Sequence, residues 1–250
     1  MTSTASEPSE ASMGQCSLPG DSLKPSIFTK IIHREVPAKI LYEDELVISF
    51  LGLPQNRVTP VQFLVVPKKQ LATLEEANSC DEAALGRMFT VASLVAKQQG
   101  VTNGYRLVIN NGNDAASEPS EASMGQCSLP GDSRKPSIFT KIIRREVPAK
   151  ILYEDELVIS FLGLPQNRVT PVQFLVVPKK QLATLEEANS CDEAALGRMF
   201  TVASLVAKQQ GVTNGYRLVI NNGNDAGQEV PHLHIHVFAG QPMSWPPGTD

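Results

Sequence analysis

A near-exact internal repeat limits the possible folds of this chain more than any other feature. Residues 5–115 recur as residues 116–226, and only residues 227–250 occur once. The copies differ at two positions, Leu23 against Arg134 and His33 against Arg144. Both copies should therefore form the same elements, and the 250 residues carry little more than one domain's worth of information. Any difference between the halves must depend largely on the segment that occurs once.

The composition excludes several classes of protein. Hydrophobic residues make up 42% and charged residues 19%, which is enough apolar material for a globular core. No run of 18 apolar residues occurs, so no membrane span is expected. The net charge of −4 argues against nucleic acid held by a basic surface. The N-terminus has neither a secretory apolar core nor the arginines of a transit peptide, and no C-x-x-C occurs, so cytoplasm or nucleus is the expected location.

The domain boundaries follow from where the apolar periodicity stops. Residues 1–26 are rich in Ser, Glu, Pro and Gly, and we expect them to form a disordered tail. The same sequence returns between the copies, so residues 115–136 are expected to act as a linker. A truncated first domain then covers residues 27–114, and a complete second domain covers residues 137–250.

Hydrophobic spacing within each copy predicts an α+β domain. A short amphipathic helix should follow Ser26 and end by Pro37. The strongest helix signal opens at a capping box of Ser79 and Glu82 and closes at Gly100. Strands are predicted for residues 39–44, 46–51, 61–68 and 105–110.

Three of the four histidines lie in the segment that occurs once. His232, His234 and His236 alternate with apolar residues, which predicts a strand over His232–Phe238. Alternate side chains of a strand share a face, so the imidazoles would point one way at steps of about 6.8 Å. The intervening apolar side chains would then point into the core.

Three interpretations of this segment are open. A half-buried strand could simply use histidine on its polar face. The imidazoles could bind zinc, with Glu229 as the nearby carboxylate. Histidine titrates near neutrality and can also act as a nucleophile and acid–base catalyst at a phosphate, beside backbone N–H groups of the Gly227 loop. No P-loop or GxGxxG segment competes for that role.

The segment HLHIHVF resembles the signature of the histidine triad family. The likeness extends to SIFTKII, VPAKILYED, FLVVPKK, GYRLVINNGNDAGQ and MSWPPG, which are similar to the nucleotide-binding branch once described as protein kinase C-interacting proteins. It covers residues 136–248 of the second copy and residues 25–114 of the first.

This resemblance implies a five-stranded antiparallel sheet with two helices, complete in the second copy and lacking the triad strand in the first. It implies a homodimer, or here an intramolecular pseudo-dimer, joined through the YRLVIN edge strand. The implied activity is hydrolysis or nucleotidyl transfer at the α-phosphate of a purine nucleotide or nucleoside phosphoramidate. No cofactor, metal, nucleic acid or membrane partner is implied.

The family's site residues carry over onto matching positions. In that scheme His234 attacks phosphorus and forms a nucleotidyl-histidine, His232 orients His234, and His236 contacts the phosphate. Water then releases the nucleoside monophosphate. The expected substrate contacts are Leu164, Asn221, Gly227, Gln228, Glu229, Val230 and Trp245.

Three positions depart from the family pattern. Gln173 stands where a fourth histidine is usual, Gly163 where an aspartate binds the ribose, and Glu229 where a serine donates to the phosphate. Loss of the ribose contact would weaken binding by roughly 1.5–3 kcal/mol, and a carboxylate beside a phosphate is repulsive. A catalytically weakened nucleotide-binding or scaffold protein is therefore an alternative to an enzyme, and a zinc-binding protein is a third.

The first copy has both neighbours of the triad strand but lacks the strand itself. Its strand over residues 105–110 would keep an unpaired side, so this copy should fold incompletely alone or pair that strand with the second copy. A rival hypothesis is that the single triad strand completes either copy. We expect at most one active site per chain.

Overall fold

The computed structural model describes residues 25–52, 59–112, 135–163 and 169–243. Nearly all of the predicted tail and of the predicted linker lies outside these ranges, as do the expected substrate contacts Leu164 and Trp245. Within the described ranges, no helix is both long and apolar enough to cross a bilayer.

The two copies form the same series of elements. The first contains α1 (Ile27–Ile32), β1 (Ile40–Glu43), β2 (Val47–Leu51), β3 (Phe63–Pro67), α2 (Glu82–Gln98) and β4 (Gly104–Gly112). The second contains α3 (Ile138–Ile143), β5 (Ile151–Glu154), β6 (Val158–Leu162), β7 (Val172–Pro178), α4 (Glu193–Gln209) and β8 (Gly215–Gly223). The second copy adds β9 (Ile235–Ala239), which comes from the segment that occurs once. Helices combine with antiparallel strands throughout, as the α+β prediction requires.

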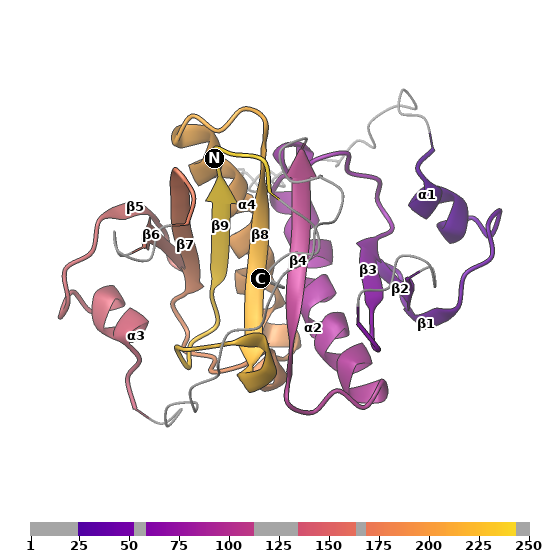
Figure 1. The fold of residues 1–250 in the computed structure, drawn as a ribbon, viewed down its shortest axis with the longest axis horizontal. Helices are drawn as coiled ribbons and strands as arrows, with labels where there is room; N and C mark the ends of the chain where they lie inside the picture. The colour runs from indigo at the N-terminus through magenta and orange to yellow at the C-terminus, as the bar shows by residue number, and fades with distance from the viewer. Residues whose placement is uncertain (1–24, 53–58, 113–134, 164–168, 244–250) are drawn as a thin grey trace, which may run out of the picture.

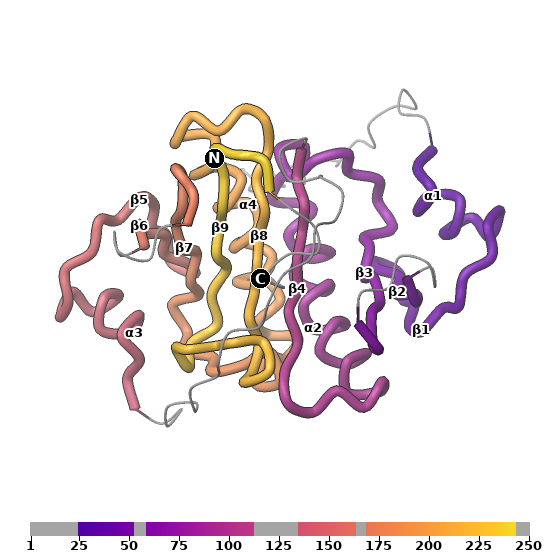
Figure 2. The backbone as a smooth tube through the Cα atoms, viewed as in Figure 1, coloured from indigo at the N-terminus to yellow at the C-terminus, as the bar shows by residue number. Residues whose placement is uncertain are grey.

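The strands of the two copies are distributed unequally between two sheets. The order β5–β6–β7–β9–β8–β4 gives a six-stranded sheet, in which β4 is the only strand from the first copy. Its nine residues pair antiparallel with β8, from Gly104 opposite Gly223 to Gly112 opposite Gly215. The strands β1–β2–β3 form a separate three-stranded sheet. The copies therefore lie side by side and meet at β4 and β8 (Figures 1 and 2).

The two long helices join the copies behind the sheets. Phe89 of α2 and Phe200 of α4 contact each other with tilted rings, whose centroids are 4.7 Å apart, inside the main core. The helices approach so closely that a Cβ added at Gly86 would lie 1.9 Å from the backbone oxygen of Glu193. Arg87 also forms a 3.0 Å ion pair with Glu193 across the contact. The equivalent contacts with the copies exchanged, at Gly197 and Arg198, give the pair of copies an approximate two-fold symmetry.

Short α3 packs on the sheet face of the second copy that is opposite to α4. Its apolar side chains share one small core with β6 and β7, which consists of Phe139, Ile142, Ile159, Phe161, Leu175 and Val177. Since Leu175 pairs with His236 of β9, this face of the sheet also carries the third histidine. The fold therefore sets the histidines beside α3 and away from the long helices.

Two predicted helix boundaries are wrong. The first helix ends at Ile32 rather than near Pro37, because Arg34 adopts a left-handed φ of 64° that no helix continues through. The capping box is formed by Asn78 and Asp81 around a short 3₁₀ turn, one residue before the predicted Ser79 and Glu82. Asn78 is also a strong N-cap residue, and its amide oxygen accepts from the Cys80 N–H at 2.9 Å.

The predicted strand over residues 61–68 has different limits in the two copies. In the second copy β7 starts at Val172, which corresponds to Val61, whereas β3 starts only at Phe63. Val172 is held by pairing with Ala239 of β9. The identical segment in the first copy has no β9 beside it, which explains its shorter strand. The strand predicted over residues 105–110 is longer than expected and runs from Gly104 to Gly112.

Candidate active site

The histidine segment is a strand only in its second half. β9 starts at Ile235, so the predicted strand over His232–Phe238 is wrong in its first three residues. There the backbone N–H of Leu233 donates to the carbonyl of Leu182 at 2.6 Å instead of joining a strand ladder. The alternation of faces nevertheless holds, because Leu233, Ile235 and Val237 are fully buried in the main core.

His234 is fixed in one orientation by the backbone. Its Nδ1 lies 2.7 Å from the carbonyl oxygen of His232. A carbonyl only accepts, so Nδ1 must carry the proton, and the lone pair of the neutral ring is on Nε2. The His234 residue is 5% exposed. This arrangement leaves Nε2 as the nucleophilic atom of the ring.

His232 positions His234 through its main chain, and its imidazole is used elsewhere. The ring Nε2 lies 2.8 Å from the carbonyl of Pro178, and Nδ1 lies 2.9 Å from the hydroxyl of Ser137. Nε2–H must donate to the carbonyl, so Nδ1 accepts from the Ser137 hydroxyl. The fully buried ring therefore ties the histidine segment to β7 and to the start of α3.

His236 lies next to His234, and one of its ring nitrogens lacks a hydrogen-bond partner among the described residues. Its ring centroid lies 4.7 Å from that of His234, and its other side stacks on Phe238 at 5.7 Å. The Nδ1 atom of His236 is buried and has no hydrogen-bond partner among the described residues. A buried polar atom without a partner is costly, so the position of this imidazole carries a cost in stability.

Burial keeps all three imidazoles neutral. It lowers the pKa of His232, despite the opposing bond to the Pro178 carbonyl. It lowers the pKa of His234 to about 4, although the His232 carbonyl acts in the opposite direction. The pKa of His236 falls to about 3 through burial and through the nearby charges of His234 and Arg106. Near neutral pH the histidines are therefore available as neutral bases.

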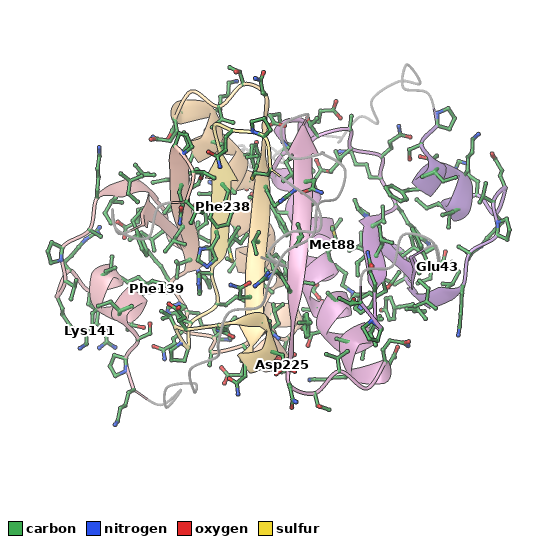
Figure 3. All side chains as sticks on the ribbon, viewed as in Figure 1. Glu43, Met88, Phe139, Lys141, Asp225 and Phe238 are labelled. Carbon is green, nitrogen blue, oxygen red and sulfur yellow. The ribbon has the colours of Figure 1, made fainter. Side chains whose placement is uncertain are left out.

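An aromatic side chain from α3 closes one side of the site. Phe139 meets His234 edge-on at 5.0 Å between ring centroids and lies 5.9 Å from His232. Figure 3 shows Phe139 beside α3 and Phe238 further along β9. Phe139 thus provides an apolar wall and contributes to the burial that lowers the pKa of His234.

The loop between β8 and β9 is tightly bonded to itself. Gly227 adopts φ 72°, a left-handed conformation suited to glycine, directly after a short 3₁₀ turn at Asn224–Ala226. The side chain of Gln228 accepts from the Gly223 N–H at 2.8 Å and donates to the Ala183 carbonyl at 2.6 Å. Gln228 therefore braces the loop, and its side chain faces the protein rather than a ligand. Gly227 and Glu229 are exposed, and Val230 is half-buried.

The first copy contributes a charged residue to this region. Arg106 of β4 lies opposite Asn221 of β8, and its Nε donates to the Asn221 side-chain oxygen at 2.8 Å. A second guanidinium nitrogen lies 3.2 Å from the carbonyl of Ala226, at the start of the loop. The predicted contact Asn221 and the loop are thereby linked to a cation from the truncated copy.

The three departures from the family pattern have distinct surroundings. Gln173 is buried, and its side-chain oxygen accepts from the Val169 N–H at 2.8 Å, so it supports the preceding loop. A Cβ at Gly163 would have the Gln173 side chain 3.9 Å away, which is ordinary contact. Glu229 is exposed and faces solvent.

The described residues offer no ready metal site. They contain no group of three His, Cys, Asp or Glu side chains arranged to hold an ion. Both ring nitrogens of His232 and the Nδ1 of His234 are already hydrogen-bonded. A separate cavity of about 740 Å³ lies between the copies, but its lining residues include none of the three histidines.

Several contacts of the site are not indicated by the sequence. Ser137 and Phe139 lie in the SIFTKII segment, whose spacing predicts an amphipathic helix and whose family likeness assigns neither residue to the site. The Ser-before-helix pattern indicates an N-cap, which Ser137 is, but not its second bond to His232. No local pattern indicates that Arg106 reaches the site, because this contact depends on how the two copies pair.

The chain resembles known proteins along both copies. A family model described as the HIT domain matches residues 33–119 and 144–243. An uncharacterized HIT-like protein of Synechocystis is 49% identical over 112 residues, which cover 45% of this chain and 96% of that protein. A second such protein, from Synechococcus elongatus, has the same identity and coverage.

Solved structures give the same family name. The structure of a HIT family hydrolase from Legionella pneumophila is 37% identical and covers 44% of this chain and 98% of its own, with a TM-score of 0.42. The structure of a histidine triad protein from Clostridium difficile is 38% identical in sequence. The match covers 44% of this chain and 95% of that protein, also with a TM-score of 0.42.

Proposed function

Because the chain belongs to the HIT domain family, we propose that it hydrolyses purine nucleoside phosphoramidates at the α-phosphate, with one active site in the second copy. Several solved relatives are described as hydrolases, which supports the reaction class. The purine substrate and the nucleotidyl-histidine intermediate are implied by the family resemblance of the histidine segment.

The observation that carries the proposal is the bond from His234 Nδ1 to the His232 carbonyl, at 2.7 Å. It fixes the ring so that Nε2 presents its lone pair, and burial lowers the pKa of His234 to about 4. A neutral, oriented imidazole needs no separate base before it attacks phosphorus. Pre-set orientation of this kind lowers the entropic cost of the reaction.

The reaction proceeds in two displacements. Nε2 of His234 forms a bond to the α-phosphorus while the P–N bond to the amine breaks, and the amine leaves with a proton taken from water. Water then attacks the phosphorus of nucleotidyl-His234, releases the nucleoside monophosphate and returns the neutral imidazole. His236, whose ring centroid lies 4.7 Å from that of His234, is the neighbouring group that contacts the reacting phosphate.

Arg106 gives the truncated copy a part in this site. Its guanidinium is close enough to lower the pKa of His236, although burial and His234 have larger effects. A cation at that distance attracts the anionic phosphate and stabilises the charge that builds up during transfer. Its bonds to Asn221 and to the Ala226 carbonyl hold it at the edge of the loop.

The assay that tests this function measures release of AMP from adenosine 5′-phosphoramidate. His234→Ala should lower kcat/KM by about a thousandfold or more, because the nucleophile is removed. His33→Ala is the matched control, since His33 is the one histidine outside the triad and its side chain is 63% exposed. Equal activity of His234→Ala and the wild type would contradict the proposal.

The alternative of a catalytically weakened nucleotide-binding protein is favoured by Gly163, which has no carboxylate for a ribose hydroxyl. Under that alternative, AMP binds in calorimetry while the wild type shows no turnover. Gly163→Asp tests whether the missing carboxylate weakens the site, because restoring the ribose contact should tighten AMP binding about tenfold or more. Among the described residues, a Cβ at this position meets only the Gln173 side chain, at an ordinary contact distance of 3.9 Å.

A further inference from the structure

In the first copy, no strand of the described residues occupies the position between β3 and β4, which is called the unfilled strand position below. In the second copy, β9 fills the equivalent position by pairing with β7 on one side and β8 on the other. Within the described ranges, β3 pairs only with β2 and β4 only with β8. Figure 1 shows β3 and β4 standing apart in front of α2, whereas β9 stands between β7 and β8 in front of α4.

The burial of identical side chains shows the consequence of the unfilled position. In the second copy, the residues around β9 are completely buried, namely Phe174, Val176, Met199, Leu218 and Ile220. Their counterparts in the first copy are only half-buried, namely Phe63, Val65, Met88, Leu107 and Ile109. Met88 is labelled in Figure 3 beside β4. Because the sequences are identical, the missing strand accounts for this exposed apolar surface.

Both edges of the unfilled position are already held in place. β3 is fixed by its pairing with β2 and by α2, whose Val91 and Val95 are buried against Val47. β4 is fixed along its whole length by β8. An incoming strand would therefore not have to order its binding site, which removes much of the usual cost of strand addition.

The chain's own β9 is retained by its connection to β8. Gln228 bonds to Gly223 at the end of β8 through both its backbone and its side chain, at 3.2 and 2.8 Å. Moving β9 to the first copy would break these bonds and leave the second copy incomplete. A strand that fills the first copy is therefore expected to come from another polypeptide.

We propose that the first copy is a receptor for a strand donated by another polypeptide, with apolar residues at alternate positions as in Leu233, Ile235, Val237 and Ala239. The donated strand would lie antiparallel to both β3 and β4, in the register that β9 has with β7 and β8. Main-chain bonds to two open edges would provide affinity, and the half-buried apolar side chains would select the alternating pattern. The interaction does not depend on catalytic activity.

The probe is a fluorescent peptide with the sequence of residues 227–240, titrated against the full chain and followed by anisotropy. One peptide should bind per chain. A peptide carrying both Ile235→Asp and Val237→Asp should bind at least about tenfold more weakly, because two carboxylates would enter the apolar surface. Absence of binding by the unmodified peptide, or equal binding of the two peptides, would overturn the proposal.

A variant of the full chain in which the first copy has its own strand shows where the peptide binds. Inserting a second copy of residues 227–243 after Ala115 supplies the first copy with its own strand and leaves the second copy unchanged. This chain should no longer bind the peptide. Binding that persists at full strength would show that the peptide displaces β9 or binds elsewhere, and would overturn the proposal.

Discussion

The first and second copies carry nearly the same sequence but differ in how well they are packed. β7 spans Val172–Pro178 and its inward side chains are fully buried, whereas β3 spans only Phe63–Pro67 and is half-buried along its length. The long helices behind them have the same seventeen residues and the same capping contacts. The length and caps of the helices, which depend on local interactions, are thus unaffected by the missing strand, whereas strand length and the burial of side chains such as Met88 depend on the neighbour.

The comparison also separates the roles of the copies in the site. The second copy holds the three histidines, the loop that precedes them and the wall formed by Phe139. The first copy contributes Arg106 and the edge strand that carries it. Under the proposed function, the truncated copy would contribute a charged residue to the complete domain's site without an active site of its own.

The largest expected effect comes from the same substitution made in each copy. Phe174→Ala should lower the free energy of unfolding by about 3–5 kcal/mol, because it empties a fully buried position in the main core. Phe63→Ala should cost no more than about half of that, since Phe63 is already partly solvated. Urea titration of the two variants measures the difference. Equal losses would show that β9 does not cause the difference in packing.

Acid should destabilise the second copy through its histidines. Their pKa values are lowered in the folded state, so the unfolded chain binds more protons below about pH 6.5. The free energy of unfolding is highest above that pH and decreases as pH falls toward the folded-state pKa, which is about 4 for His234 and about 3 for His236, by up to about 1.4 kcal/mol per pH unit for each histidine. Urea titrations at pH 7.5 and pH 5 measure the slope, and His234→Gln, which cannot titrate, should reduce it. A slope unchanged by that variant would exclude His234 as a contributor.

Arg106 tests whether the first copy contributes to catalysis. Arg106→Ala should lower kcat/KM for the phosphoramidate about tenfold, through loss of a charged hydrogen-bond donor near the phosphate. Arg106→Lys should recover part of the loss, since the charge is kept. Asn110→Ala is the matched control, because Asn110 is the mirror of Asn221 on the copy without histidines. Activity of Arg106→Ala equal to that of the control would remove Arg106 from the mechanism.

The smallest effect is expected where the copies differ in sequence. His33 and its counterpart Arg144 are both exposed, with side-chain exposures of 63% and 58%. His33→Arg should therefore change the free energy of unfolding by less than about 0.5 kcal/mol. A larger change would mean that this substitution, and not only the missing strand, distinguishes the copies.

Elements with a strong local pattern were predictable from the sequence, whereas long-range contacts were not. The helix before Gly100 and the inward direction of Leu233, Ile235 and Val237 followed from periodicity alone. The late start of β9 did not, because Leu233 bonds to a loop some fifty residues earlier. Arg106 could not be assigned to the site, because its approach depends on the pairing of β4 with β8.

The most direct test of the central claim is the stoichiometry and position of the covalent intermediate. The protein is quenched during turnover of the phosphoramidate, digested with trypsin and analysed by mass spectrometry. The peptide that starts after Arg217 is unique to the second copy but contains His232, His234 and His236, so fragmentation of that peptide is used to assign the modified histidine. We predict at most one nucleotidyl group per chain, attached to His234. Turnover with the adduct on another residue, or with two adducts per chain, would contradict a single active site in the second copy.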